Sequence, residues 1–267
     1  MNGKYWDRAW SLVDGCTPCS PGCEHCWSAS IAHRFRRGVD LGDGRIDLRI
    51  GEYTNDDGQF NGKITLNHHR LDIPLKRKKP TVWAIWNDLF HKDVSFDFLT
   101  ETWLNMALTH RHTYLVLTKR PERMLTFASA WKMEDFPHIW PIVTVCNQPE
   151  ANEKIPLSLN TPAVHRGVSI EPMLGPISLR WLPGTYAEKR RVYGEYDQLK
   201  KIDWVVLGGE TGPGARPVHP DWVRSVRDQC QAAGVPFYLK QLDSRRNRIL
   251  DDREHNDLPW EVKHENR

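Results

Sequence analysis

Four of the six cysteines lie within eleven residues of one another: Cys16, Cys19, Cys23 and Cys26. Cysteine thiolates are strong ligands for zinc and for iron–sulfur clusters. A secreted disulfide framework would spread its cysteines along a shorter chain, and a chain of 267 residues can bury a core without disulfides. The clustering therefore indicates a metal site.

The last three cysteines follow the pattern Cys19-x₃-Cys23-x₂-Cys26. This spacing resembles the one general to radical S-adenosylmethionine enzymes. Three thiolates can hold a four-iron cluster and leave one iron open for a ligand. In such enzymes the open iron binds S-adenosylmethionine, and reduction yields a 5′-deoxyadenosyl radical. The resemblance implies a [4Fe–4S] cluster, S-adenosylmethionine as cofactor and an external electron donor as partner.

Zinc is the alternative for this cluster of thiols, because the same residues also form two Cys-x₂-Cys pairs, Cys16/Cys19 and Cys23/Cys26. Zinc ribbons place about 15–20 residues between such pairs. Here three residues separate them, a short distance for two independent knuckles, which favours the iron–sulfur interpretation. The remaining cysteines, at 146 and 230, stand alone and are expected to be buried as small hydrophobic residues.

The elements that must position the cysteines alternate between short apolar runs and helix-like stretches. Near-continuous β-branched and aromatic runs are typical of strands buried on both faces of a parallel sheet. Helical patterns cover 96–110, 122–131 and 220–233. No Gly-x-Gly-x-x-Gly or Walker loop follows a first strand, so we predict an α/β fold, a partial or full (β/α) barrel of parallel strands. The predicted strands are 9–13, 81–86, 113–118, 142–146, 166–170, 204–207 and 237–240.

The barrel is expected to span residues 1–242, and two stretches within it look like additions. Residues 38–79 form a polar insertion without a clear period, and residues 183–201 carry a second basic segment. Residues 243–267 are predicted to be a polar, loosely packed C-terminal tail. The net charge is +3, and neither an 18-residue apolar run nor a leader is evident. We expect a cytoplasmic protein with no membrane association; its oligomeric state is not predicted.

Longer segments extend the resemblance beyond the cysteines. They are WNDLF at 86–90, LTKRPERM at 117–124, SIEPMLGPISL at 169–179, and the stretch 202–241. With GCTPCSPGCEHCW at 15–27, they resemble a phage-associated family of radical-S-adenosylmethionine-like proteins of largely unassigned function. The likeness covers almost the whole chain and implies a role in phage-type base modification.

One departure from that family concerns Cys19, where many family members have an aliphatic residue. Their trio of ligands would correspond to Cys16, Cys23 and Cys26, whereas the general spacing selects Cys19, Cys23 and Cys26. We favour the second trio, because its compact loop best surrounds one cluster. Cys16 remains the alternative first ligand.

Polar residues follow the predicted strands, at the barrel end where active sites gather. Related enzymes contact the methionine ammonium after the second strand. Cations after the third can pair with the methionine carboxylate, and amides after the fourth can bond the ribose. Ser169, from the fifth strand, is added to this set. We assign cofactor binding to Asn87, Asp88, Lys119, Arg120, Asn147, Gln148 and Ser169.

Three further strand-end residues, Glu171, Glu210 and Lys240, are the predicted catalytic groups. A single polar residue at a strand end is also a common turn or helix cap. His25, between two of the cysteines, is expected to pack over the cluster.

Basic residues recur at 34–37, 76–79, 189–191 and 245–248. Such runs are usually solvated surface, but with the twelve tryptophans they could also bind phosphates and stack on bases. We therefore predict an enzyme that abstracts hydrogen from a nucleobase or its side chain, in DNA or a nucleotide, and so rearranges, isomerises or cleaves it. The alternatives are a radical enzyme acting on a peptide or small metabolite, and a zinc-stabilised nucleic-acid-binding module.

Overall fold

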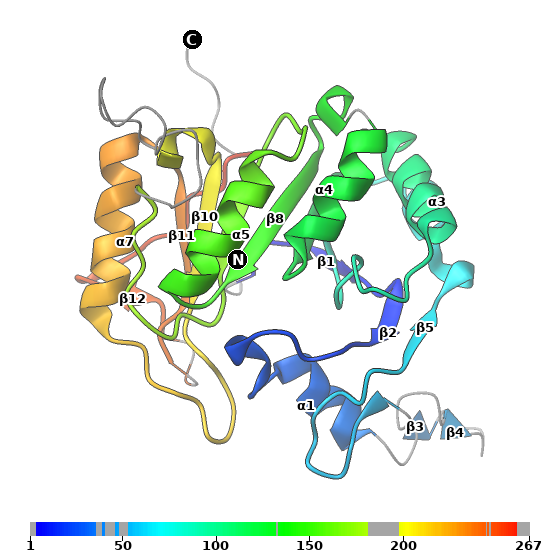
Figure 1. Ribbon diagram of the computed structural model, residues 1–267, viewed down its shortest axis with the longest axis horizontal. Coiled ribbons are helices and arrows are strands. Elements are labelled where there is room, and N and C mark those ends of the chain that lie inside the picture. The colour runs from blue at the N-terminus through cyan, green and yellow to red at the C-terminus, as the bar shows by residue number, and fades with distance from the viewer. Residues whose placement is uncertain are drawn as a thin grey trace.

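The computed structural model describes residues 4–35, 39–40, 46–47, 53–131, 133–180, 198–243, 245 and 247–260. Its centre is a seven-stranded sheet in which every pairing is parallel (Figure 1). The strands lie side by side in chain order: β1 (Arg8–Trp10), β6 (Val82–Ile85), β7 (Thr113–Thr118), β8 (Ile139–Val145), β9 (Gly167–Ile170), β10 (Trp204–Gly208) and β11 (Phe237–Gln241).

This strand order explains the curvature of the sheet. Parallel neighbours need crossover connections, and these are almost always right-handed. Because each new strand is added on the same side of the previous one, the crossovers run over one face. The helices α3, α4, α5 and α7 cover that face, and the sheet curls away from them into a half-barrel with β1 and β11 at its edges (Figure 1). The predicted α/β partial barrel is confirmed.

The helix ends follow local signals. In α7, Pro220 occupies the first turn and Gly234, at φ 70°, ends the helix in the left-handed region, as predicted. Three α-helices were not predicted: α1, the four-residue α2 in the polar insertion, and α5. The pattern of α5 is obscured by the prolines in its first turn and at Pro156. None of the described helices is long and apolar enough to cross a membrane. The α-helices are α1 (Trp27–Arg34), α2 (Ile73–Lys76), α3 (Phe96–Ala107), α4 (Pro121–Ala130), α5 (Gln148–Leu159) and α7 (Pro220–Ala233), and the 3₁₀ helices are η1 (Pro21–Cys23), η3 (His68–Arg70), η4 (Met133–Asp135) and η5 (Gln198–Lys201).

Residues 9–13, predicted as one strand, divide into parts of two. The chain leaves the main sheet after Trp10, and Val13 begins β2, which pairs with β5 from the polar insertion. The cysteine loop therefore starts from a small antiparallel sheet instead of directly from the barrel. The two-stranded sheets are β2 (Val13–Gly15) with β5 (Ile64–Leu66), β3 (Val39–Asp40) with β4 (Ile46–Asp47), and β12 (Ile249–Leu250) with β13 (Arg253–Glu254).

An aromatic cluster fills the amino-terminal end of the half-barrel on its concave face. Trp140, Trp204 and Tyr238 come from the first residues of their strands and pack with Tyr5. The ring of Trp260 lies 5.1 Å from that of Trp204, so the end of the described chain packs on the barrel more closely than its polar composition suggests. The cluster closes this end and leaves the carboxyl ends of the strands free to form a cavity.

Candidate functional site

A cavity of about 1050 Å³, including the space of its open mouth, lies at the carboxyl ends of the strands. All four clustered cysteines line it. Small residues on the concave face, Ala9, Ala84 and Thr144 among them, leave room for it. Seven of the strand-end residues predicted from the sequence also line it: Asn87, Asp88, Lys119, Arg120, Ser169, Glu171 and Lys240.

The cysteine loop, residues 16–26, is held tightly against the barrel. The Arg120 guanidinium donates to the carbonyl oxygen of Thr17 at 2.7 Å. A Cβ atom at Gly22 would lie 2.9 Å from Cδ of Pro172, so glycine allows the loop to pack against the segment after β9. Residues that follow the carboxyl ends of β7 and β9 therefore both contribute to placing the loop.

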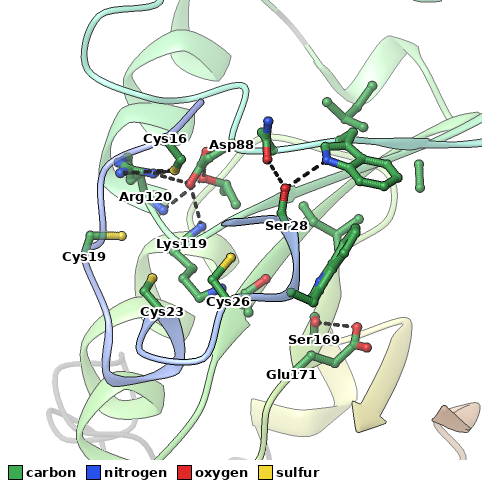
Figure 2. Close-up of a pocket in the computed structure, with 18 of the residues that line it drawn as sticks. Cys16, Cys19, Cys23, Cys26, Ser28, Asp88, Lys119, Arg120, Ser169 and Glu171 are labelled. Atoms are coloured by element: carbon green, nitrogen blue, oxygen red, sulfur yellow. Dashed lines mark hydrogen bonds and ion pairs between the residues drawn. The ribbon is translucent and has the colours of Figure 1, made fainter. Parts of the chain in front are cut away.

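The four thiols differ in their surroundings (Figure 2). A hydrogen bond from the Cys19 thiol lowers the pKa of Cys23 to about 5 against the effect of burial, and Lys119 adds to the lowering. Burial raises the pKa of Cys16 to about 11, and its sulfur lies 3.9 Å from an Arg120 nitrogen. The pKa values of Cys19 and Cys23 thus depend on each other, while Cys16 lies beside Arg120. Which of Cys16 and Cys19 is the first ligand stays a prediction.

The thiols do not form a ready-made metal site. Among the described residues, no three His, Cys, Asp or Glu side chains form a group that could hold a metal ion. The sulfur atoms of the loop must therefore draw closer together to share one ion or cluster. Cys146 and Cys230 are buried, as predicted, and the Cys146 sulfur is occupied by a 2.8 Å hydrogen bond to Glu150.

Asp88 connects the ends of β6 and β7. Its carboxylate accepts hydrogen bonds from the side chains of Arg120 and Thr118, both at 2.6 Å, and from the backbone nitrogens of Lys119 and Phe90. Burial opposes the charge of Arg120, but Asp88 more than offsets this and holds the Arg120 pKa above its ordinary value. The Arg120 guanidinium is therefore engaged within the protein, and its role is to tie the cysteine loop to the barrel.

Asn87 has φ 61°, a left-handed conformation that asparagine tolerates better than most residues. Its amide nitrogen donates to the Val13 carbonyl at 2.8 Å, and its amide oxygen accepts from Ser28 Oγ at 2.7 Å. Val13 begins β2 and Ser28 lies in α1, the two elements that flank the cysteine loop. Asn87 therefore fixes both flanks of the loop.

A polar network lies farther along the cavity. The carboxylate of Glu171 accepts from Tyr5 Oη at 2.8 Å and from Ser169 Oγ at 3.0 Å, and it forms an ion pair with Lys240 at 2.5 Å. Burial raises the pKa of Glu171, but Lys240, Tyr5 and Ser169 together outweigh burial and hold it below its ordinary value. The site thus contains a charged pair, Glu171 with Lys240. The sequence predicted these two residues separately, each at the end of its own strand.

Glu210, predicted to be catalytic, does not line the cavity. Its carboxylate binds the Arg216 guanidinium through both oxygens, at 2.6 and 2.9 Å, and contacts His25 Nδ1 at 2.9 Å. Arg216 also bonds the Pro21 carbonyl and the Glu24 carboxylate. Burial raises the pKa of Glu210, but these donors lower it to about 2. We call Glu210, Arg216 and His25 the loop clamp, because Arg216 binds Pro21 and Glu24, which lie on either side of Cys23 in the sequence.

The loop clamp gives a first prediction. Arg216→Met should loosen the loop and, if its cysteines hold iron as predicted, accelerate loss of that iron to a chelator by about tenfold or more, as for other groups that orient metal ligands. Iron retention of the anaerobically loaded protein measures this. Arg224→Met is the matched control, because Arg224 also binds two carboxylates but lies in α7. Equal rates of loss in the two variants would contradict the clamp.

Asn147 and Gln148 are also outside the cavity lining. Asn147 Oδ1 caps α5 by accepting from the Glu150 backbone nitrogen at 3.0 Å, and Gln148 bonds Asn152 and the Ser178 backbone. The Asn147 side chain thus satisfies a backbone donor that would otherwise lack a partner, and the Gln148 side chain ties α5 to residue 178. Their contact with a cofactor stays a prediction.

Sequence reasoning missed the aromatic wall of the cavity. Trp6, Trp27, Trp86 and Phe60 line it, and the Trp27 ring meets that of Trp86 edge-on at 4.6 Å. Trp27 directly follows Cys26 and is 46% exposed, so it offers a ring surface at the cavity. The only sequence signal was the number of tryptophans, which says nothing about where their rings lie.

The basic runs do not line the cavity where they are described. Lys76 pairs with Asp72 at 2.5 Å, and Arg77 donates to Thr81. Residues 36–37, 189–191 and 246 lie outside the described residues.

The fold and the loop together define a half-barrel with a cysteine-lined cavity at its carboxyl end. Residues 2–259 match the DUF5131 family, described as proteins of unknown function, and the chain belongs to this family. A protein of Arabidopsis thaliana described as an F-box protein is 34% identical over 77 residues, which are 28% of this chain and 21% of that protein. So short a match supports no statement about function. No solved structure matches significantly.

Proposed function

We propose that this protein is a radical S-adenosylmethionine enzyme. The observation that carries the proposal is the position of the four-cysteine loop at the cavity of a parallel half-barrel, at the end where the strands deliver polar side chains. The partial barrel is a fold typical of enzymes, and the spacing of the cysteines favours a cluster with one open iron.

The residues present fit such a cluster. Cys19, Cys23 and Cys26 would hold it, with Cys16 as the alternative first ligand. Lys119 lines the same cavity, and its ammonium has no hydrogen bond or ion pair with another described residue, so the site has a cation ready for an anionic group. When bound, the cluster and S-adenosylmethionine would supply an organic radical that abstracts hydrogen.

The chain's own residues then position the substrate and exclude water. The aromatic wall supports a planar substrate, and we propose a nucleobase in DNA or a nucleotide, modified by rearrangement, isomerisation or cleavage. Aromatic side chains stack on bases without regard to sequence. Glu171 and Lys240 offer an acceptor and a donor for the polar edge of that base.

Anaerobic purification and reconstitution test the proposal. The protein should carry about four irons and four sulfides per chain. With dithionite and S-adenosylmethionine it should release 5′-deoxyadenosine, and nucleosides from treated DNA should show a new mass. Stoichiometric zinc without iron loading would contradict the proposal. Release of 5′-deoxyadenosine with unchanged nucleosides would instead indicate that the substrate is a peptide or small metabolite.

A further inference from the structure

Three of the described lysines are not exposed: Lys119, Lys154 and Lys240. Lys154 pairs with Glu150, and Lys240 pairs with Glu171, each at 2.5 Å. Lys119 has no such carboxylate. Its backbone nitrogen donates to Asp88, but its ammonium forms no hydrogen bond or ion pair with another residue that the structure describes. Removing a charge from water without a partner is costly, so this ammonium calls for an anion that the carboxylates of the described residues do not supply.

Two of the loop cysteines lie next to this side chain. Figure 2 shows Lys119 beside Cys23 and Cys26, and all three residues line the cavity. The Asp88 carboxylate is already paired with the Arg120 guanidinium at 2.6 Å. Lys119 is therefore the one cation of this cavity that is aimed at the cysteines and not neutralised by a carboxylate of the described residues.

We propose that Lys119 sets the reduction potential of the cluster that these cysteines hold. This inference rests on the proposed function. Three thiolates give the site a negative charge, and the electron from the external donor increases that negative charge. A fixed positive charge beside two of the ligands, in a cavity of low dielectric, favours the reduced form and raises the potential. Lys119 is thus a positioning charge that acts through the cluster.

This role differs from pairing with the methionine carboxylate, the role assigned to Lys119 from its place after the third strand. If the partner of Lys119 is the methionine carboxylate, Lys119 should affect the protein only after S-adenosylmethionine binds. If its partners are the cysteines, Lys119 should affect the reduction potential before S-adenosylmethionine binds. The potential of the protein without S-adenosylmethionine therefore separates the two roles.

The test is a redox titration of the anaerobically reconstituted full chain, with dithionite as reductant and the reduced cluster followed by electron paramagnetic resonance. Lys119→Met should make one-electron reduction at least tenfold less favourable, a shift of about 59 mV to lower potential. Lys119→Gln, also uncharged, should shift it similarly, and Lys119→Arg should keep most of the parent value. Lys92→Met, which removes an exposed lysine, is the control and should leave the potential unchanged.

One result would overturn the inference: a fully loaded Lys119→Met or Lys119→Gln protein with the parent potential. If that variant also binds S-adenosylmethionine more weakly, Lys119 instead pairs with the methionine carboxylate. If the parent loads its cluster and cleaves S-adenosylmethionine but the potential does not move, this inference alone fails. If the parent takes up no cluster, the proposed function fails as well.

Discussion

Replacing Cys23 with alanine is expected to reduce bound iron from about four atoms per chain to almost none. Cys23 belongs to both candidate trios, and its pKa is lowered by Cys19 and Lys119, which favours the thiolate, the form that binds metal. Two thiolates cannot hold a cluster that needs three. Iron and sulfide analysis after anaerobic reconstitution measures the loss, and Cys26→Ala should behave in the same way.

Cys230→Ala is the matched control, because Cys230 lies on the buried face of α7 and does not line the cavity with the loop. It should keep the parent iron content if it folds. Iron retained at the parent level in Cys23→Ala would show that the metal binds elsewhere or that the loop is not a cluster site.

The same measurement separates the two trios. Cys19→Ala should lose the cluster and Cys16→Ala should largely keep it, because only Cys19 completes the compact spacing Cys19-x₃-Cys23-x₂-Cys26, whereas Cys16 lies beside Arg120. The reverse result would establish Cys16 as the first ligand and make the family-like trio correct.

Lys240→Met is expected to destabilise the fold by about 3–5 kcal/mol at neutral pH, because it leaves the Glu171 carboxylate without its charged partner in a nearly enclosed site. Urea denaturation of the apo-protein measures the change. Combining it with Glu171→Gln should recover part of the loss, since no unpaired charge then remains. Lys76→Met, which breaks an exposed pair, is the control and should cost at most about 0.5 kcal/mol.

The same pair predicts a pH dependence. The pKa of Glu171 is lower in the folded protein than in the unfolded chain, so its ionised form contributes stability above its unfolded pKa of about 4.3. That contribution is lost as the pH falls through the lower, folded pKa. The stability difference between the parent and Glu171→Gln should therefore shrink on acidification. A Lys240→Met protein as stable as the parent, with an unchanged acid response, would show that the pair is not coupled.

The local sequence pattern was sufficient to predict most strands and helices of the barrel. Runs such as 113–118 are apolar over their whole length because both faces of a parallel strand are covered, and the structure has β7 at the same bounds. The ends of α7 were equally readable, because Pro220 and Gly234 act through their own backbone angles. The division of 9–13 was not readable, because whether Val13 continues β1 or begins β2 depends on pairing with β5, some fifty residues later.

The sequence by itself determined the cysteine spacing, the parallel α/β architecture and the set of polar residues at the strand ends. Those features depend on neighbours in the chain or on the apolar character of a single run. Only the tertiary structure decided which strand-end side chains line the cavity and which partners they have. The Asn147 side chain caps a helix and Glu210 binds Arg216, whereas the Lys119 ammonium has no carboxylate partner among the described residues. Whether a side chain has a partner depends on groups that are distant in sequence. The aromatic wall of the cavity depends on such groups too, because Trp6 precedes β1 and Trp86 follows β6. Burial and partner choice arise when the barrel closes around the loop, and no local pattern encodes them.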